Sequence, residues 1–206
     1  MVEVAAIVLC GGESRRMGTC KADLPFGPET LLQRSVRLIG GVARPLVVAA
    51  AHDQPIPPLP AFAIVARDPP SRRGPLQGLA SGLAALGRDV DLVYLASVDA
   101  PFFKPRWLET LVATIGDHDA VVAVIEGRID PLNALYRAAP TRSAVEGLLG
   151  RGQLRASTLF DCLNTRAVAD SELRRLDPDG RALANLNTPE DYRRALDLLE
   201  GRAPSS

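Results

Sequence analysis

The stretch that decides the fold is residues 4–21, which read Val4-Ala5-Ala6-Ile7-Val8-Leu9-Cys10-Gly11-Gly12-Glu13-Ser14-Arg15-Arg16-Met17-Gly18-Thr19-Cys20-Lys21. The six apolar residues at its start predict a short buried strand. Glycines and the cations Arg16 and Lys21 follow it. Glycine lets backbone N–H groups approach a polyanion closely, and the cations can neutralise phosphate charge. The stretch therefore predicts a strand that leads into a triphosphate-binding loop.

Similar apolar runs recur along the chain, and segments with helical spacing separate them. The further runs are Leu46 to Ala50, Ala63 to Ala66, Leu92 to Leu95 and Ala120 to Ile125. Apolar residues repeat at helical intervals within 31–39, 79–86 and 107–115. Strands that alternate with helices predict an α/β fold whose mostly parallel central sheet is covered on both faces, with ligands beyond the carboxyl ends of the strands.

The end of the chain carries a clear helix signal, whereas the segment before it does not. Thr188 is placed to cap a helix that Pro189 begins, and Asp191 supplies the acid of a capping box. We expect that helix to run to about Leu199. Residues 154–163 have a helical pattern, and residues 167–176 fit a strand or a helix equally well. The proline-rich stretch 54–60 is expected to be a surface loop rather than a linker, so residues 1–206 are predicted to form one domain.

Composition excludes several classes of protein. The chain has 24 Lys and Arg against 24 Asp and Glu, a balance that disfavours a nucleic-acid surface. Its three cysteines have no metal or disulfide spacing, which favours a reducing cytoplasm. No apolar run approaches the roughly 20 residues of a membrane-spanning helix. We therefore expect a cytoplasmic protein with a small-molecule partner, no nucleic acid, no membrane contact and a monomeric state.

Two common nucleotide-binding motifs are absent from the loop. It lacks the GxGxxG string of dinucleotide-binding proteins, and Lys21 is followed by alanine rather than by the serine or threonine of a P-loop. A dehydrogenase and a P-loop kinase are both disfavoured.

The loop resembles instead the LAGGxSRRMGxxK signature of the nucleotidyltransferase family that includes the molybdenum cofactor guanylyltransferases. Four further stretches agree with that family in the same order. They are Gly74 to Leu79, Ser97 to Pro101, Asp130 to Leu132 and Asn185 to Asp191. The resemblance implies a Rossmann-like three-layer sandwich and the transfer of GMP from Mg-GTP to the terminal phosphate of molybdenum-bound molybdopterin, with release of pyrophosphate. It also implies transient contact with proteins that deliver or accept the molybdenum cofactor.

The resemblance also assigns roles to individual residues. Those with a catalytic role are Arg16, Lys21 and Asp99. Those that bind the nucleotide are Leu9, Cys10, Gly11, Gly12, Lys21, Asp68, Gly74, Pro75 and Asp99. Asp99 and Asn187 would hold Mg²⁺, which is typically bound by one or two carboxylates together with substrate phosphates.

Each assignment has a purely structural alternative. Asp99 and Asp68 fit turns, and Asn187 fits the start of the capped terminal helix. Gly78 and Gly82 fit either close helix packing or contact with a nucleobase.

The chain departs from the family pattern at four places. Cys10 replaces an alanine, Cys20 stands where an aspartate often precedes the lysine, and Ser97 replaces a cysteine. An asparagine that often follows the second strand is missing from residues 49–52. The paired glycines Gly11 and Gly12 favour guanine, because relatives that use cytidine more often have alanine and glycine there. The alternatives are a cytidylyltransferase or another transferase with a different phosphorylated acceptor, and a non-catalytic nucleotide-binding protein.

Overall fold

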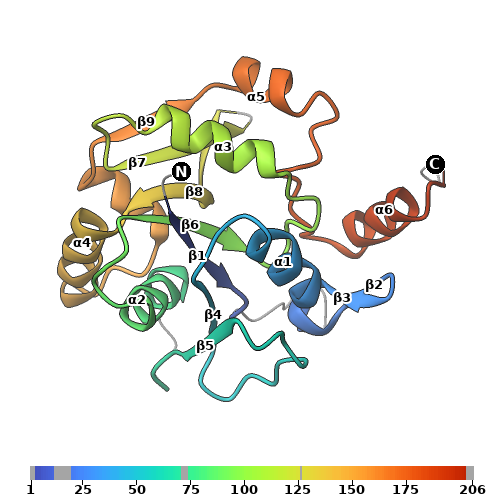
Figure 1. Ribbon diagram of the computed structural model, residues 1–206, viewed down its shortest axis with the longest axis horizontal. Helices are drawn as coiled ribbons and strands as arrows, with labels where there is room; N and C mark the ends of the chain where they lie inside the picture. Colours follow the sequence, from blue (N-terminus) through green and yellow to red (C-terminus); the bar gives the residue numbers. More distant parts are fainter. Residues whose placement is uncertain (1–2, 12–19, 71–73, 126, 203–206) are drawn as a thin grey trace.

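The computed structural model describes residues 3–11, 20–70, 74–125 and 127–202. Its centre is a sheet of seven strands in the order β5-β4-β1-β6-β8-β7-β9 (Figure 1). In chain order these strands are β1 (Val4–Leu9), β4 (Leu46–Ala50), β5 (Ala63–Arg67), β6 (Leu92–Ser97), β7 (Ala120–Ile125), β8 (Arg128–Arg137) and β9 (Thr165–Val168). A separate two-stranded hairpin consists of β2 (Pro25–Phe26) and β3 (Glu29–Thr30).

The strands of the sheet are parallel except at β8. Strand β1 pairs in parallel with β4 and β6, and β4 pairs in parallel with β5. Strand β8 runs antiparallel to both of its neighbours, β6 and β7, while β9 is parallel to β7. The predicted mostly parallel sheet is confirmed. The carboxyl ends of β5, β4, β1 and β6 consequently lie along one edge.

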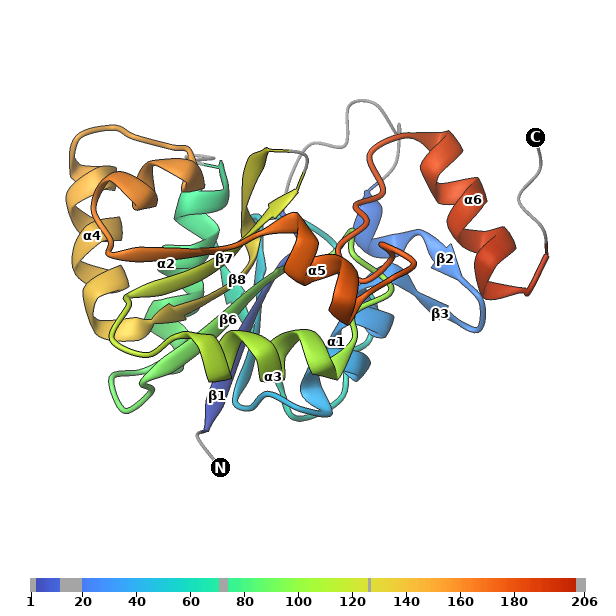
Figure 2. The ribbon, with the colours of Figure 1, turned by 90° about the horizontal axis from the view of Figure 1, so that it is seen from above.

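Helices cover both faces of the sheet. They are α1 (Leu31–Gly40), α2 (Gly74–Leu86), α3 (Pro105–Thr114), α4 (Ala138–Gly150), α5 (Asp170–Leu176) and α6 (Pro189–Leu199), with short 3₁₀ helices at Lys21–Asp23 (η1) and Ala156–Asp161 (η2). Figure 2 shows α2 and α4 side by side on one face, with α1 and α3 on the other. No helix in the described ranges has the length and apolar composition needed to cross a membrane.

The burial pattern of β1 explains the three layers. All six of its residues are buried, and successive side chains point to opposite faces. Ile7 packs in the core with α2 and α4, whereas Ala6 and Val8 pack in the core with α1 and α3. A strand buried on both faces reads as a continuous apolar run rather than as an alternating one. The predicted sandwich is therefore a direct consequence of this run.

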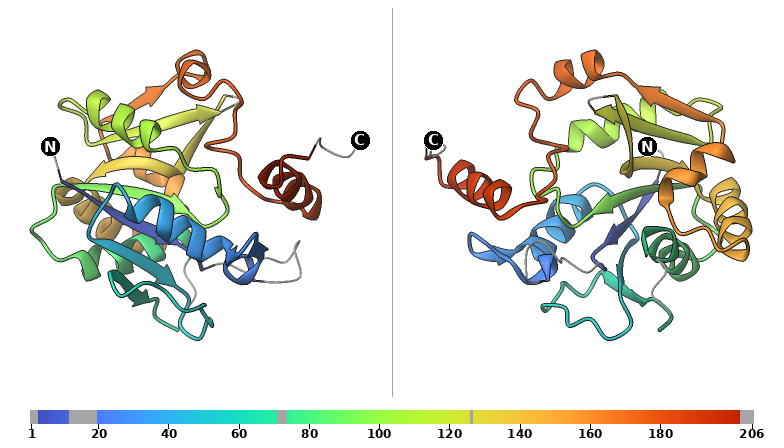
Figure 3. Two further views of the ribbon diagram at one scale, coloured as in Figure 1. Left: turned by 45° about the vertical axis from the view of Figure 1, so that its right-hand side comes forward. Right: turned by 180° about the vertical axis from the view of Figure 1, so that it is seen from behind.

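The terminal helix α6 begins as predicted. Thr188 Oγ1 accepts a hydrogen bond from Asp191 N at 3.1 Å, and Asp191 Oδ2 accepts one from Thr188 N at 2.9 Å. Figure 3 shows α6 standing beside the β2–β3 hairpin, where the Tyr192 hydroxyl donates to the Pro25 carbonyl. The cap and this contact fix the direction in which residues 185–188 approach the sheet.

Some expectations needed correction. Strand β8 was not predicted, nor was the β2–β3 hairpin. The helical pattern in residues 154–163 corresponds to the 3₁₀ helix η2, and the ambiguous segment 167–176 holds both the end of β9 and helix α5. Residues 52–60 form an irregular segment with alternating exposed and half-buried residues, so the predicted surface loop is confirmed.

Candidate active site

The residues predicted to bind a nucleotide lie along the edge formed by the carboxyl ends of the strands. Cys10 N donates to Ala49 O at 3.0 Å, and Val98 N donates to Leu9 O at 3.1 Å. Asp68 N donates to Ala50 O at 2.9 Å. These bonds extend the pairing of the strands by one residue each, so that Leu9, Cys10 and Asp68 lie with Asp99 on the same edge. Arg16 and Gly12 fall outside the described residues.

Three polar side chains from distant parts of the chain meet at this edge. Lys21 Nζ lies 2.6 Å from Asp99 Oδ2 and 3.5 Å from Asn187 Oδ1. Side-chain exposure is only 17% for Lys21 and 14% for Asp99, so water screens this ion pair less than it would a surface pair. Leu186 N also donates to Asp99 O at 2.9 Å, which attaches the segment before α6 to the end of β6. The structure thus brings together Lys21, Asp99 and Asn187.

Asp99 retains an unused acceptor. Its Oδ1 is buried and makes no hydrogen bond to any described residue. A buried carboxylate oxygen without a partner is costly unless a ligand or cation completes it. Oxygen is the ligand atom that Mg²⁺ prefers, and both Asp99 and Asn187 offer one here. The donor set therefore fits a divalent cation.

The fit requires substrate oxygens as well. In the described part of the chain, no group of three or more His, Cys, Asp or Glu side chains is arranged to hold a metal ion. Mg²⁺ commonly keeps waters and binds through one or two carboxylates plus phosphates, so a two-residue donor set is consistent with such a site.

Asp68 is a second half-buried carboxylate on this edge. Burial raises its pKa above the usual value, and a hydrogen bond with Ser81 of α2 partly opposes that shift. Its Oδ1 also lacks a partner among the described residues. A half-buried acceptor with a raised pKa is able to bind a ligand N–H or O–H group.

The beginning of α2 lies near this carboxylate. Gly74 has a φ of +64°, a conformation that side chains rarely adopt, and Pro75 follows it in the first turn. The two glycines further along α2 face the sheet. A Cβ at Gly78 would lie 2.9 Å from Leu9 Cδ2, and one at Gly82 would lie 2.7 Å from Ile7 Cγ2. Close packing therefore accounts for Gly78 and Gly82.

Cys10 and Gly11 mark the point where β1 enters the loop. The Cys10 thiol is buried, and desolvation raises its pKa to about 12. It is therefore protonated at neutral pH and is not a nucleophile. A Cβ at Gly11 would lie 3.1 Å from Ala51 N, so a glycine lets the chain pass close to the end of β4.

Sequence reasoning missed Gln54. Its side-chain amide donates to Cys10 O at 2.9 Å and to Cys20 Sγ at 3.1 Å. Gln54 was read only as part of a proline-rich loop, and no local motif marks it. Only the fold reveals that the loop after β4 returns to the glycine-rich segment.

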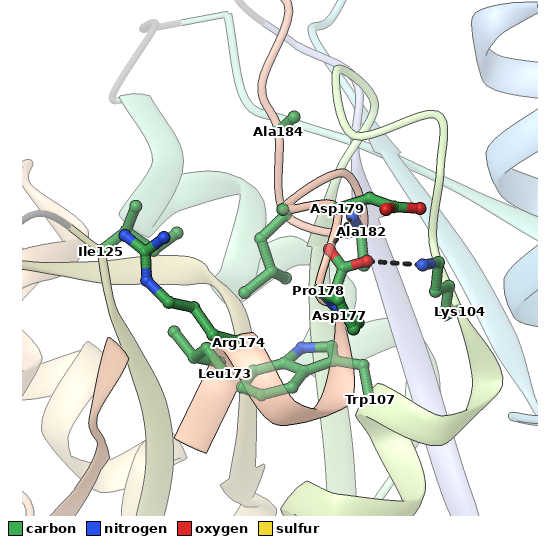
Figure 4. Close-up of a pocket in the computed structure, with 12 residues that line it drawn as sticks. Lys104, Trp107, Ile125, Leu173, Arg174, Asp177, Pro178, Asp179, Ala182 and Ala184 are labelled. Carbon is green, nitrogen blue, oxygen red and sulfur yellow. Dashed lines mark hydrogen bonds and ion pairs between the residues drawn. The ribbon is translucent and has the colours of Figure 1, made fainter. Parts of the chain in front are cut away.

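Sequence reasoning also missed a cavity of about 260 Å³ between α3, α5 and the segment 177–184 (Figure 4). Trp107 and Leu173 give it apolar walls, and Lys104 Nζ pairs with Asp177 Oδ1 at 2.5 Å on one side. Trp107 begins the helical pattern found in residues 107–115, and it is 3% exposed. The cavity depends on side chains some 70 positions apart, which no local pattern would associate.

Comparisons with known proteins agree with this geometry. The family profile described as the MobA-like NTP transferase domain matches residues 6–165. A Mycobacterium tuberculosis H37Rv protein named "Probable molybdenum cofactor guanylyltransferase" is 38% identical over 191 residues, covering 91% of this chain and 90% of that protein. A protein of the same name from Mycobacterium ulcerans is 35% identical over 194 residues, covering 92% of each.

Solved structures show the same fold at lower identity. Molybdopterin-guanine dinucleotide biosynthesis protein A from Archaeoglobus fulgidus has a TM-score of 0.78 and 22% identity, covering 96% of this chain and 99% of that one. The 2-C-methyl-D-erythritol 4-phosphate cytidylyltransferase of Thermus thermophilus has a TM-score of 0.71 and 18% identity, covering 97% and 100%. Given the matched profile and the similarity over nine-tenths of the chain, the protein belongs to the MobA-like NTP transferase family and is a nucleotidyltransferase.

Proposed function

We propose that this protein transfers GMP from Mg-GTP to the terminal phosphate of molybdenum-bound molybdopterin and releases pyrophosphate. The observation that carries the proposal is the meeting of Lys21, Asp99 and Asn187 just after the glycine-rich loop. The names of the relatives at 35–38% identity support the same substrates. We further propose that the chain acts as a single-domain monomer in the cytoplasm.

The chemistry requires positioning and charge neutralisation more than proton transfer. An oxygen of the acceptor phosphate attacks the α-phosphorus of GTP, a new P–O bond forms, and the bond from the α-phosphorus to the bridging oxygen breaks as pyrophosphate leaves. The attacking phosphate is already ionised at neutral pH, so no general base is needed. Lys21 lies where it can neutralise the triphosphate, and we assign Arg16 the same task.

Asp99 and Asn187 would hold Mg²⁺, which in such a site neutralises phosphate charge. Lys21 supplies a cation to Asp99 Oδ2. Asp99 Oδ1, which has no partner among the described residues, is the oxygen that would be available to the cation. The ion pair with Lys21 and the hydrogen bond from Leu186 N to Asp99 O hold this residue in place.

The nucleotide half of the site would be built from the ends of β1, β4 and β5 and the start of α2. We propose that backbone groups of Leu9 to Gly12 and of Gly74 and Pro75 contact the nucleotide, and that Asp68 accepts a hydrogen bond from it. Guanine is the favoured base because of Gly11 and Gly12. A cytidylyl specificity is the second candidate, since the cytidylyltransferase fold is so similar.

Calorimetric titration with Mg-GTP, Mg-CTP and Mg-ATP tests base choice, and pyrophosphate release with the molybdenum-loaded pterin tests transfer. We expect GTP to bind best. Equal or reversed affinity would replace guanylyl with cytidylyl or broad specificity, and binding without pyrophosphate release would indicate a non-catalytic protein.

Asp99→Asn tests the metal assignment, because it keeps the shape of the side chain and removes its charge. The rate of GMP transfer should fall by orders of magnitude, and the Mg²⁺ concentration that gives the half-maximal rate should rise. The matched control is Asp91→Asn, which changes a carboxylate that is 70% exposed and pairs with Arg137. An unaltered rate and magnesium midpoint in Asp99→Asn would exclude the metal-ligand role.

A further inference from the structure

The side chain of Gln54 joins the two ends of the glycine-rich loop. Cys10 immediately precedes that loop and Cys20 immediately follows its central segment. One amide nitrogen, Gln54 Nε2, donates to Cys10 O at 2.9 Å and to Cys20 Sγ at 3.1 Å. An amide nitrogen has two N–H groups, so each end of the loop can receive one.

The other end of the Gln54 amide is fixed to the sheet. Gln54 Oε1 accepts a hydrogen bond from Ala51 N at 3.2 Å, and Gln54 N donates to Ala51 O at 3.2 Å. These two bonds close a tight turn directly after β4. Arg67, the last residue of β5, donates from Nη1 to Ala51 O at 3.1 Å and to Gln54 O. Arg67 therefore holds the backbone of this turn from the neighbouring strand, and both N–H donors of the Gln54 side-chain amide are in use.

The contact with Cys20 links Gln54 to the ion pair of Lys21 and Asp99. Cys20 precedes Lys21 directly and is the N-cap residue of η1. Asp23 N and Leu24 N donate back to Cys20 O and Lys21 O, both at 3.2 Å, which makes this short turn one unit. Lys21 then reaches Asp99 at 2.6 Å. A shift of Cys20 away from Gln54 would consequently move the backbone of Lys21.

A neutral amide suits this position. A carboxylate here would lose both N–H donors, and an ammonium group would lose the acceptor for Ala51 N. The amide instead restrains both ends of the loop through directional bonds and adds no charge.

We propose that Gln54 is a positioning residue for nucleotide binding: its amide clamps Cys10 to Cys20, and so sets the separation of these two residues and the location of Lys21. The identity of the nucleotide in this inference rests on the proposed function, whereas the clamp itself does not. Gln54 touches neither the substrate nor the reacting atoms in this proposal, and acts through Cys10, Cys20 and Lys21.

Three variants test the clamp. Gln54→Ala removes all of its side-chain hydrogen bonds and leaves the backbone bonds of the turn. Gln54→Glu keeps the length and the acceptor for Ala51 N but loses both donors, so the turn after β4 survives while the clamp is lost. The control is Gln33→Ala: Gln33 Nε2 donates to Pro58 O at 3.0 Å in the same loop and Gln33 Oε1 accepts from Thr30 N at the start of α1, so this variant also loses stability, but neither atom bonds to Cys10 or Cys20.

Calorimetry and steady-state kinetics give the first readout. Gln54→Ala should raise the Kd and KM for Mg-GTP roughly tenfold, as expected when about two hydrogen bonds no longer organise a site. Gln54→Glu should be impaired at least as much. The KM for the pterin acceptor and the values for Gln33→Ala should stay near wild type. If Gln54 only stabilises the fold, Gln54→Ala and Gln54→Glu should lower the midpoint of thermal unfolding without a selective effect on the Kd and KM for Mg-GTP.

Alkylation of Cys20 gives a second readout that needs no nucleotide. In a Cys162→Ser background, which removes the exposed thiol, mass spectrometry can follow the reaction of Cys20 with iodoacetamide. Loss of the clamp should speed this reaction several-fold in Gln54→Ala and Gln54→Glu, but not in Gln33→Ala. Unchanged alkylation overturns the clamp. Faster alkylation with wild-type affinity for Mg-GTP overturns its role in binding. If the wild-type protein binds no nucleotide, the proposed function fails, and the alkylation rates still decide the clamp.

Discussion

Replacing Gly82 by alanine should destabilise the protein, although alanine is the better helix former. A Cβ at this position would lie 2.7, 2.8 and 2.9 Å from Cγ2, Cδ1 and Cγ1 of Ile7. Two of these atoms are attached directly to the Cβ of Ile7, so a change at the far end of the side chain cannot relieve the overlap. Ile7 is 0% exposed in the middle of the sheet. Helix α2 must therefore move away from β1 by about 0.8 Å to restore normal carbon contacts near 3.5 Å.

Two opposing effects set the magnitude. Overpacking of a core costs typically 1–3 kcal/mol, while a change from glycine to alanine inside a helix gains roughly 0.5–1 kcal/mol. The expected net loss is about 1 kcal/mol, which lowers the midpoint of thermal unfolding by about 2–4 °C in a chain of this size.

Gly147→Ala is the matched control for this change. Gly147 lies inside α4, and its added Cβ would meet only the guanidinium of Arg151, at 3.8 Å or more. Gly147→Ala should gain stability from the higher helix propensity of alanine without any steric overlap. It should therefore unfold at a higher temperature than wild type. Differential scanning calorimetry of the three proteins measures both shifts. A Gly82→Ala protein that is as stabilised as Gly147→Ala would refute the close contact between α2 and β1.

Two further predictions concern charged groups. Lys21→Ala should weaken Mg-GTP binding by at least tenfold, or about 1.4 kcal/mol, in calorimetric titration, whereas Lys104→Ala, which breaks the comparable pair with Asp177, should not. Wild-type affinity in Lys21→Ala would remove Lys21 from the site. Asp68 has a pKa raised above 3.8, so the stability that its protonated form contributes is lost as the pH rises through the folded-state pKa. Asp68→Asn should therefore gain stability over wild type between about pH 4 and neutrality, as measured by urea unfolding, and a constant difference across that range would contradict the raised pKa.

The elements that could be predicted are those whose local sequence agrees with their final environment. Strands β1, β4 and β7 begin and end where their apolar runs do, because each is buried along most of its length. Helix α6 begins at Pro189 because the capping residues are adjacent in the chain. In such segments the tertiary structure adds little to what propensity and pattern already specify.

Strand β8 was not predicted because its two halves differ in amino-acid composition. Its first half contains Arg128, Asp130 and Pro131, which together look like a loop. The register of β8 with β7 shifts between Val121 and Ala123, and the proline lies in that irregular part, where a missing N–H is tolerated. Gly127, with a φ of +75°, marks the reversal before β8 and was the one available signal.

The site residues also fall into those that the sequence could predict and those that it could not. Lys21 and Asp99 could be proposed from motifs, since each follows a recognisable strand or loop in the sequence. Their 2.6 Å contact, and the arrival of Asn187 from the far end of the chain, depend on the tertiary structure. Gln54 carries no local signal at all, because its partners lie 44 and 34 positions away.

The reversed direction of β8 has a consequence for how the chain reaches its native state. Strands β7 and β8 are separated only by residues 126 and 127, so this hairpin can form early at a small cost in loop-closure entropy. Its pairing with β6, by contrast, joins Leu92 to Arg137 and closes a much longer loop. We therefore expect the amino-terminal parallel strands and the β7–β8 hairpin to be distinct folding units, with the docking of β8 onto β6 as a late step. Asp99 lies two residues after β6, and its partners Lys21 and Leu186 come from distant parts of the chain, so it acquires its full surroundings only when those segments have come together.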